Sequence, residues 1–490
     1  MSETDTLQKN AMHGLVWAAV DRFSTIFIQF GVNLVLARLL MPADFGIIGM
    51  IWIFLGVSQV VIEGGFVSAL IQKKEPTQTD FSTIFFSNIA VSSLLYLLLF
   101  VTAPLIAGFY RMPLLTDVLR VLGLWLIVYS INVVQTARLR KKLQLKTIAI
   151  ANLSAIVGSG ALAIFLAYHG LGVWSLIIQQ ISYGVVTTVL YLIITHWMPS
   201  LSFSVQSWKQ LFGFGGYMLI STILQEIAYN LQGILIGRRF SATQMGYYTQ
   251  ANRLDMVTSR SLPQVINQVL FPVFSSVQTD LPRLRQMLIL STQLIAFITF
   301  PIMGALVVSA DSVVTLLFGE KWLASGTFLQ ILCVGGFVTC LQIVTFHAVA
   351  AVGCSRQLFV WSIYKWIFLF VALIVGMEFG IYGIMWAITI GNYNIYIVNA
   401  LQVQRHIGLS VWIQWKILLP ISALAIIGMA AGFGCRYLLH MPTLLCGVLT
   451  VVFFLLGAIV TRSEALRQTL RILKNHLGKK NKPKKPYRSN

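Results

Sequence analysis

Four basic residues lie inside long apolar runs of the sequence, namely Arg22, Arg253, Arg260 and Lys365. Arg253 and Arg260 are two helical turns apart, so their side chains are predicted to share one face of a helix. Two guanidinium groups on one line suit bidentate hydrogen bonds to phosphate oxygens. Because charges inside apolar segments usually mark functional sites, these four cations are predicted to line a wet cavity that binds an anionic group.

Three of these cations also have a structural interpretation, and the sequence leaves both interpretations open. Arg22 can form an ion pair with a carboxylate, although the adjacent Asp21 points about 100° away on a helix. Asp255 can serve as a partner for Arg253. Lys365 stands near the start of its apolar run, so its ammonium group can extend to the membrane surface.

One phrase occurs twice in the chain, in residues 34–46 and 234–246. Arg38 corresponds to Arg238 and Gly46 to Gly246 at one constant offset, and each copy stands between two apolar runs. Many transporters are built from two such repeats. The copies share these four residues but differ at every buried charge. The four are therefore predicted to be scaffold residues, with both arginines as anchors at the outer ends of helices.

The composition identifies a membrane protein. Hydrophobic residues make up 57% of the 490 residues and charged residues 10%, with a mean hydropathy of +0.81, whereas soluble domains carry about 25% charged residues. The net charge of +20 comes mainly from one set of alternating loops and from the tail. This is the positive-inside pattern, which predicts cytoplasmic N- and C-termini and no nucleic-acid partner.

The apolar runs predict an all-α protein with about fourteen transmembrane helices. Twelve form two pseudo-symmetric six-helix lobes, 1–200 and 201–405, and a C-terminal helix pair follows in 406–462. Residues 463–490 form a predicted basic cytoplasmic tail. The predicted helices are 13–39, 46–71, 81–109, 115–137, 148–168, 171–194, 210–237, 244–272, 286–310, 325–352, 357–378, 380–401, 416–438 and 443–461.

The carboxylates within these runs are candidates for coupling and gating. Glu226 lies deep in its predicted helix, where it can take up a proton or pair with an arginine. Glu63 belongs to a Glu-Gly-Gly turn and is predicted to act as a gate or scaffold. Asp255 is the third carboxylate predicted to take part in coupling or gating. Polar side chains in the spans suit either sugar hydroxyls or interhelical hydrogen bonds: Asn132, Gln135, Gln179, Gln180, Gln225, Gln232, Asn392, Tyr393 and Asn394.

Several phrases resemble those of polysaccharide flippases of the Wzx type, in the multidrug/oligosaccharidyl-lipid/polysaccharide exporter superfamily. Residues 36–46 resemble the end of the first helix in that family, and residues 63–75 resemble the end of the second. Residues 318–333 are similar to the colanic acid exporter branch. Met41 is a departure, because the family often has glycine there.

This resemblance implies a V-shaped, two-lobed fold with a central cavity. It also implies that an undecaprenyl-pyrophosphate-linked oligosaccharide crosses from the cytoplasmic to the periplasmic leaflet of the inner membrane, by alternating access. Such transport serves the synthesis of capsule, exopolysaccharide or lipopolysaccharide O-antigen. Its implied partners are membrane lipids, a proton or sodium gradient and the polysaccharide polymerase machinery.

The sequence supports two other functions less well. A cation-coupled multidrug antiporter needs acidic cavity walls, whereas the buried cations here match or exceed the buried acids. A membrane glycan polymerase usually has a large external loop, and the predicted outer loops are short. The sequence has no phosphate-binding loop or HExxH motif, and its five cysteines form no CxxC pair. We therefore predict no enzymatic activity, no cofactor and no metal site.

Overall fold

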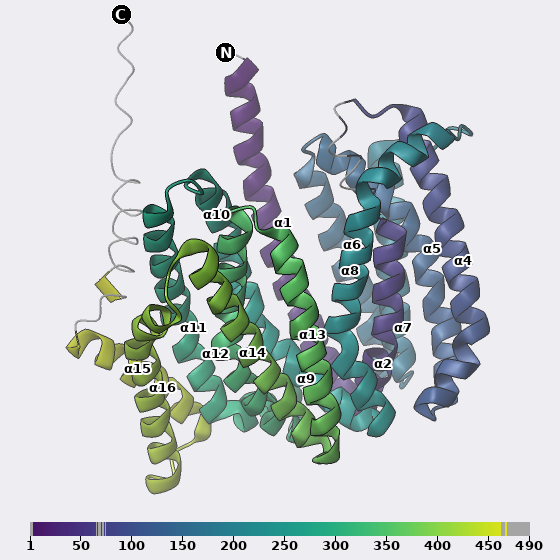
Figure 1. The fold of residues 1–490 in the computed structure, drawn as a ribbon. Helices are drawn as coiled ribbons and strands as arrows, with labels where there is room; N and C mark the ends of the chain where they lie inside the picture. Colours follow the sequence, from purple (N-terminus) through teal and green to yellow (C-terminus); the bar gives the residue numbers. More distant parts are fainter. Residues whose placement is uncertain are drawn as a thin grey trace, which may run out of the picture. The chain divides into compact units, whose positions relative to one another are not determined.

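The structure is a computed structural model that describes residues 3–64, 66, 70, 73, 75–461, 466 and 467. Within them every regular element is a helix (Figure 1), which confirms the predicted fold class. The chain divides into two compact units, Met1–Gly246 and Tyr247–Asn490, and each is considered by itself. Apart from residues 466 and 467, the predicted tail lies outside the described residues.

The first unit is a bundle of long helices that pack mainly on neighbours. Helix α6 packs against α1 and α7, and α5 packs against α4 and α7. Helix α8 packs against α2 and α4, so it belongs to the first compact unit. The predicted lobes follow the sequence repeat instead, and they place this helix at the start of the second lobe, 201–405. The helices are α1 Glu3–Leu39, α2 Pro42–Glu63, α4 Gln78–Tyr110, α5 Leu114–Lys141, α6 Leu145–Tyr168, α7 Val173–Thr195 and α8 Val205–Arg239.

Helix α2 ends earlier than the sequence predicts. The predicted run continued to residue 71, but Gly64 adopts a left-handed conformation with φ 52° and caps the helix after Glu63. Glycine has no Cβ and takes this conformation without strain, so it stops the helix where the apolar pattern alone does not.

Gly46 and Gly246 are the glycines of the two repeated segments, and each lies against the backbone of the other segment. A Cβ at Gly46 would overlap the carbonyl group of Ala242, and a Cβ at Gly246 would overlap that of Pro42. The start of α2 and the start of α9 (Ala242–Met256) therefore cross with their backbones in contact. Only glycine permits so close an approach of two backbones.

Helix α9 begins in the first unit, which includes its residues Ala242–Gly246, and the second unit continues from Tyr247 of α9 through a further series of helices. Helix α11 packs against α12, α15 and α16, and α14 packs against α12 and α13. The predicted C-terminal helix pair is present as α15 and α16. The helical elements are α9 Ala242–Met256, η1 Val257–Ser261, α10 Leu262–Ser276, α11 Leu281–Phe318, η2 Glu320–Trp322, α12 Ala324–Ala351, α13 Ser355–Glu378, α14 Gly380–Ile407, α15 Val411–Leu438 and α16 Thr443–Val460.

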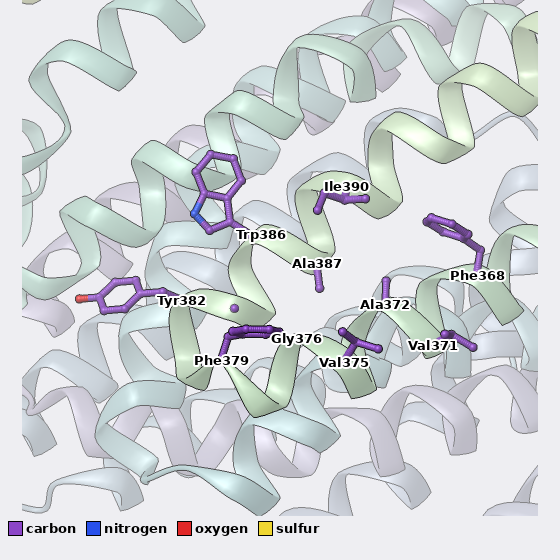
Figure 2. A pocket seen from close by; sticks show the side chains of 11 residues that line it. Phe368, Val371, Ala372, Val375, Gly376, Phe379, Tyr382, Trp386, Ala387 and Ile390 are labelled. Carbon is purple, nitrogen blue, oxygen red and sulfur yellow. The ribbon is translucent and has the colours of Figure 1, made fainter.

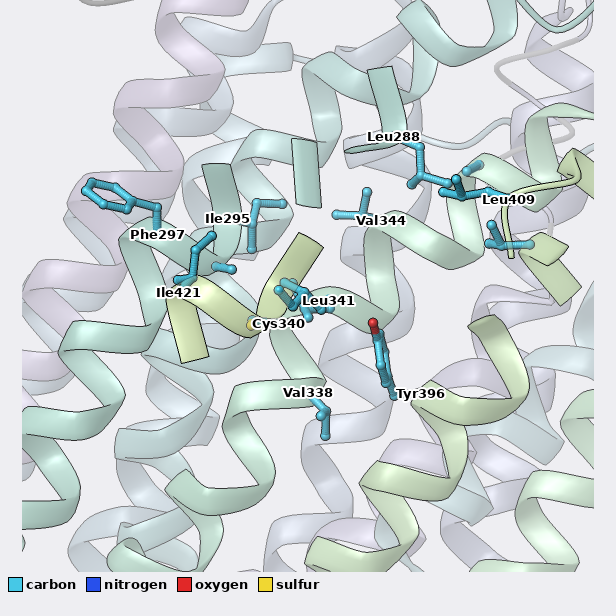
Figure 3. Close-up of a cluster of buried hydrophobic side chains, with 14 of the residues drawn as sticks. Leu288, Ile295, Phe297, Val338, Cys340, Leu341, Val344, Tyr396, Leu409 and Ile421 are labelled. Carbon is cyan, nitrogen blue, oxygen red and sulfur yellow. The ribbon is translucent and has the colours of Figure 1, made fainter. Parts of the chain in front are cut away.

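A large apolar core holds the second unit together. Leu341 and Val344 of α12 are fully buried in it, close to Ile421 of α15 (Figure 3). The rings of Phe297 and Phe454 join α11 to α16, with centroids 5.4 Å apart. In a bilayer such contacts stabilise by close packing rather than by removal from water.

A π-helical segment, η1, interrupts the helix predicted at 244–272. The N–H of Leu262 donates to the carbonyl of Val257, five residues back. Pro263 follows at once and has no N–H to donate to the carbonyl four residues before it, which favours a local change of hydrogen-bond register. The predicted helix is thus present as α9, η1 and α10 in succession, running from Ala242 to Ser276.

Eleven of the described helices are long and apolar enough to cross a membrane. They are α2, α4–α7 and α11–α16, which makes the protein a multi-pass membrane protein. The other three predicted spans are also helical. Among the described residues Phe23–Leu39 of α1 is a shorter apolar helix, α8 includes side chains outside what the structure describes, and the third span is divided by η1. The count of fourteen therefore stays a prediction.

Candidate functional site

The predicted cavity cations fall in both units. Arg22 lies in α1, and its side chain is outside what the structure describes. Arg253 is exposed on α9, Arg260 is half-buried in η1, and Lys365 is buried on α13. Three of the four cations thus belong to the second unit.

The π-helical turn changes the geometry predicted for Arg253 and Arg260. The prediction that they share one face assumed a regular α-helix between them. A residue in a π-helix advances around the axis by a smaller angle than a residue in an α-helix, since more residues complete each turn. Arg260 lies within η1, so it is rotated away from the two-turn alignment with Arg253.

Lys365 has a partner inside the second unit. Its side chain is 6% exposed, and Nζ donates a hydrogen bond of 3.0 Å to Oδ1 of Asn399 on α14. The amide of Asn399 in turn donates to the carbonyl of Gln342 on α12, at 3.3 Å. These contacts join three helices. The ammonium group is therefore held inside the second unit, which differs from the alternative that it extends to the membrane surface.

Asp255 is a buried carboxylate close to the π-helical segment. It is 8% exposed, and Oδ2 accepts a hydrogen bond of 2.9 Å from Ser259. A Cβ at Gly336 of α12 would lie 2.9 Å from Oδ1, and within the described residues that oxygen has no hydrogen-bond partner. A buried carboxyl oxygen in this state is costly unless a proton or a ligand reaches it.

Glu226 has a different environment. Its carboxylate is half-buried on α8 and accepts a hydrogen bond of 2.8 Å from Nδ2 of Asn230, one turn further along. The same carboxylate lies against Gly56 of α2, where a Cβ would meet it. In the part of the chain that the structure describes, no ion pair joins Glu226 to an arginine.

The two repeated arginines lie at helix ends. Arg38 is exposed in the last turn of α1. Arg238 is exposed in the last turn of α8, where Nη1 donates to the carbonyl of Phe109 and the guanidinium group lies 4.9 Å from the ring centroid of Phe109. A cation at a helix C-terminus also interacts favourably with the helix dipole.

A polar cavity of about 390 Å³ lies within the first unit. Helices α1, α2, α5, α6 and α7 all contribute to its wall. The lining residues are Asp21, Trp52, Gln59, Glu63, Trp125, Tyr129, Asn132, Val133, Thr136, Arg140, Ile148, Asn152, Gln180, Tyr183, Gly184, Thr187 and Tyr191.

Hydrogen bonds connect several groups on this wall. Tyr129 donates its hydroxyl to the carboxylate of Glu63. Asn152 donates to Asp21 at 3.3 Å and accepts from the hydroxyls of Tyr183 at 3.5 Å and Tyr191 at 3.4 Å. Among the described residues neither carboxylate has an ion-pair partner. The cavity is therefore a polar site with two carboxylates, one arginine (Arg140) and aromatic walls.

A second cavity, of about 560 Å³, lies along α13 and α14 and is apolar (Figure 2). Phe368, Val375 and Trp386 are among its walls, and Gly376 lets the two helices approach closely because a Cβ there would meet the carbonyl of Gly383. A wall that is mostly apolar suits a hydrocarbon chain, and none of its lining residues carries a charge.

Sequence reasoning identified only part of the polar cavity. It named Glu63 as a gate or scaffold residue and Asn132 and Gln180 as candidates for sugar contact, and all three line the cavity. It missed Trp125 and Tyr129, because aromatic residues in an apolar span look like ordinary membrane-facing side chains. The signal available was their spacing of one helical turn on α5, combined with the polar residues that follow.

Solved structures of membrane transport proteins have a similar fold. The fold is similar to one named "Lipid II flippase MurJ, inward closed conformation", with a TM-score of 0.73, 14% identity, and coverage of 91% of this chain and 99% of the other. It is also similar to an inward-facing multidrug resistance MATE family transporter of the MOP superfamily, with a TM-score of 0.63, 16% identity, and coverage of 80% and 98%. At these identities the likeness shows the fold alone, which is that of this class of membrane proteins.

The chain belongs to the polysaccharide biosynthesis protein family, whose model matches residues 35–327. It is 28% identical to the teichuronic acid biosynthesis protein TuaB of Bacillus subtilis (strain 168), over 73% of this chain and 74% of that protein. It is 24% identical to the lipopolysaccharide biosynthesis protein WzxC of Escherichia coli (strain K12), over 85% and 87%. The succinoglycan biosynthesis transport protein ExoT of Rhizobium meliloti (strain 1021) is 25% identical, over 73% and 72%. The resemblance stated from the sequence is thereby confirmed.

Proposed function

We propose that this protein is a flippase that moves a lipid-linked oligosaccharide across the membrane for the synthesis of a surface polysaccharide. The observation that carries the proposal is the family match over residues 35–327. Relatives named for teichuronic acid, lipopolysaccharide and succinoglycan biosynthesis support it. The lipid is proposed to be undecaprenyl pyrophosphate, carried from the cytoplasmic to the periplasmic leaflet by alternating access.

The charged part of this substrate needs cations along its path. A pyrophosphate group at the bilayer centre costs several kcal/mol or more if nothing stabilises it. Arg253 is exposed on α9 while its neighbours Leu254 and Asp255 are buried. Arg253 and Arg260, aided by Arg22, are proposed to bind the pyrophosphate. Lys365 is a weaker candidate because Asn399 and the surrounding helices already enclose it.

Coupling to a proton or sodium gradient is proposed to involve Asp255. Its partner-free Oδ1 faces α12 within the second unit, where uptake of a proton or a small cation removes the cost of a buried charge. Glu226 is a second candidate, although Asn230 already provides it with a donor. Glu63 is proposed to act within the first unit, where it lines the polar cavity.

The proposed location is the bacterial inner membrane, with both termini in the cytoplasm. The positive-inside charge pattern supports this orientation. Membrane lipids and the polysaccharide polymerase machinery are the proposed partners, because the flipped oligosaccharide is the material that a polymerase on the outer leaflet consumes.

Deletion of the gene, followed by analysis of lipid-linked sugars and surface polysaccharide, tests the proposal. We expect lipid-linked intermediates to accumulate on the inner leaflet and the surface polysaccharide to be lost, both restored by the wild-type gene. Normal surface polysaccharide and no accumulated intermediate in the deletion strain would contradict the proposal.

Uptake of cationic dyes in the same strains tests the alternative antiporter function. If the protein were such an antiporter, the deletion strain should show reduced efflux of the dyes.

A further inference from the structure

The polar cavity of the first unit is large for an ion and has the size of a small-molecule site. Its volume is about 390 Å³, whereas a single water needs only about 10–15 Å³ and ligand pockets cover roughly 300–1,000 Å³. Among the described residues no group of three His, Cys, Asp or Glu side chains is placed to hold a metal ion. A polar lining around a volume of this size suits a polar organic group.

Aromatic rings form one wall of this cavity. The centroids of Trp52 and Trp125 lie 6.4 Å apart, and those of Trp125 and Tyr129 lie 5.1 Å apart. Trp125 is 5% exposed and so held firmly by its neighbours, while Trp52 is 37% exposed. Aromatic faces are electron-rich and attract the C–H groups on one face of a pyranose ring.

The rest of the wall supplies hydrogen-bonding groups suited to hydroxyls. The carboxylates of Asp21 and Glu63 accept, the amide of Asn152 can donate and accept, and tyrosine hydroxyls can do both. The described wall holds these two carboxylates and one cation, Arg140, and neither carboxylate has an ion-pair partner in the described structure. The excess of acceptors suits the O–H donors of a sugar better than a phosphate. Aromatic faces together with carboxylates and amides make the chemistry of a carbohydrate site.

We propose that this cavity binds one or two sugar residues of the glycan, separately from the arginines that bind the pyrophosphate. The inference rests on the proposed function, since it assigns the sugar part of the same substrate to the first unit. It predicts that affinity for the glycan and affinity for the pyrophosphate depend on different residues.

The test compares two lipids on the purified full-length protein in lipid nanodiscs. The probes are undecaprenyl pyrophosphate without sugar and the glycan-bearing lipid isolated from the deletion strain, with binding measured by native mass spectrometry. For Trp52→Leu we expect about five- to tenfold weaker binding of the glycan-bearing lipid and unchanged binding of the sugar-free lipid. Trp52→Phe keeps an aromatic face and should retain most of the affinity.

Trp415→Leu is the matched control, because Trp415 is 46% exposed on α15 and does not line the cavity. It should leave the binding of both lipids unchanged. If wild type prefers the glycan-bearing lipid but Trp52→Leu and Asp21→Asn both keep that preference, the cavity proposal is wrong and the flippase proposal stands. If wild type binds neither lipid, both proposals fail.

Discussion

Neighbouring residues of α9 have opposite environments. Arg253 is exposed and Asp255 is buried, only two positions apart, because consecutive helical residues point about 100° apart. One helix can therefore present a cation to a ligand on one side and keep a carboxylate inside the second unit on the other. Two distinct consequences follow at the scale of single residues.

The first consequence concerns Arg260, the cation in η1. Arg260→Glu should reduce export of lipid-linked oligosaccharide by about tenfold or more, since the new carboxylate repels a pyrophosphate. The measurement is surface polysaccharide in the deletion strain carrying the variant. Arg405→Glu, at an exposed arginine in the last turn of α14, is the control and should export normally. Full export by Arg260→Glu would remove this residue from the site.

The second consequence concerns Asp255, the buried carboxylate of α9. Asp255→Asn should fold, because the amide oxygen can still accept the hydrogen bond from Ser259. It should lose the stimulation of flipping by an imposed proton or sodium gradient, measured in proteoliposomes. Asp117→Asn, at an exposed position in the first turn of α5, should keep it. Unchanged gradient stimulation in the Asp255 variant would assign coupling to another group.

At the scale of helices, the crossing of α2 and α9 depends on two glycines. Gly46→Ala places a methyl group on the backbone of Ala242, and Gly246→Ala places one on that of Pro42. Each should destabilise the fold by about 1–3 kcal/mol, seen as a lower Tm in thermal unfolding of the detergent-solubilised protein. Gly158→Ala is the matched control, because its Cβ would meet nothing within 4 Å. Equal Tm values for all three variants would rule out the crossing.

The sequence predicts the membrane-spanning helices because the length of each apolar run indicates that it can cross a bilayer. The repeated phrase singles out Gly46 and Gly246, because the same residue type recurs at equivalent positions, and their scaffold role stays a prediction. The π-helical turn was not predictable, since it depends on one hydrogen bond choosing an acceptor five residues back. The alignment expected for Arg253 and Arg260 was altered for that reason.

The polar cavity was only partly predictable for a different reason. Asn132 and Gln180 stood out because polar residues are rare in apolar spans, but the same sequence signal fits a hydrogen bond between helices. Asn132 in fact does both, since it lines the cavity and its amide donates to the carbonyl of Gly184 at 3.3 Å. Tertiary contacts between α5, α6 and α7 decide which side chains face the same space, and no pattern within one segment contains that information.

For the whole molecule, the charge distribution makes a prediction about orientation. Lys141 and Lys142 lie at the end of α5 and Arg111 at the end of α4, so the two loops should face opposite sides of the membrane. Alkaline phosphatase fused after Arg111 should be active, whereas fusion after Lys142 should be inactive. A fluorescent protein fused to the C-terminus should be bright, as expected in the cytoplasm. The reverse pattern would overturn the proposed topology.

The π-helical turn has a consequence for the history of the two repeats. A π turn contains one residue more than the α turn it replaces, so it is what a single inserted codon leaves in an established helix. The equivalent stretch of the first repeat, residues 57–61 of α2, is regular α-helix. The simplest account is a duplicated ancestor in which one copy later gained a codon and thereby turned an arginine in a new direction. The two halves would then differ by a change of length as well as of residue type.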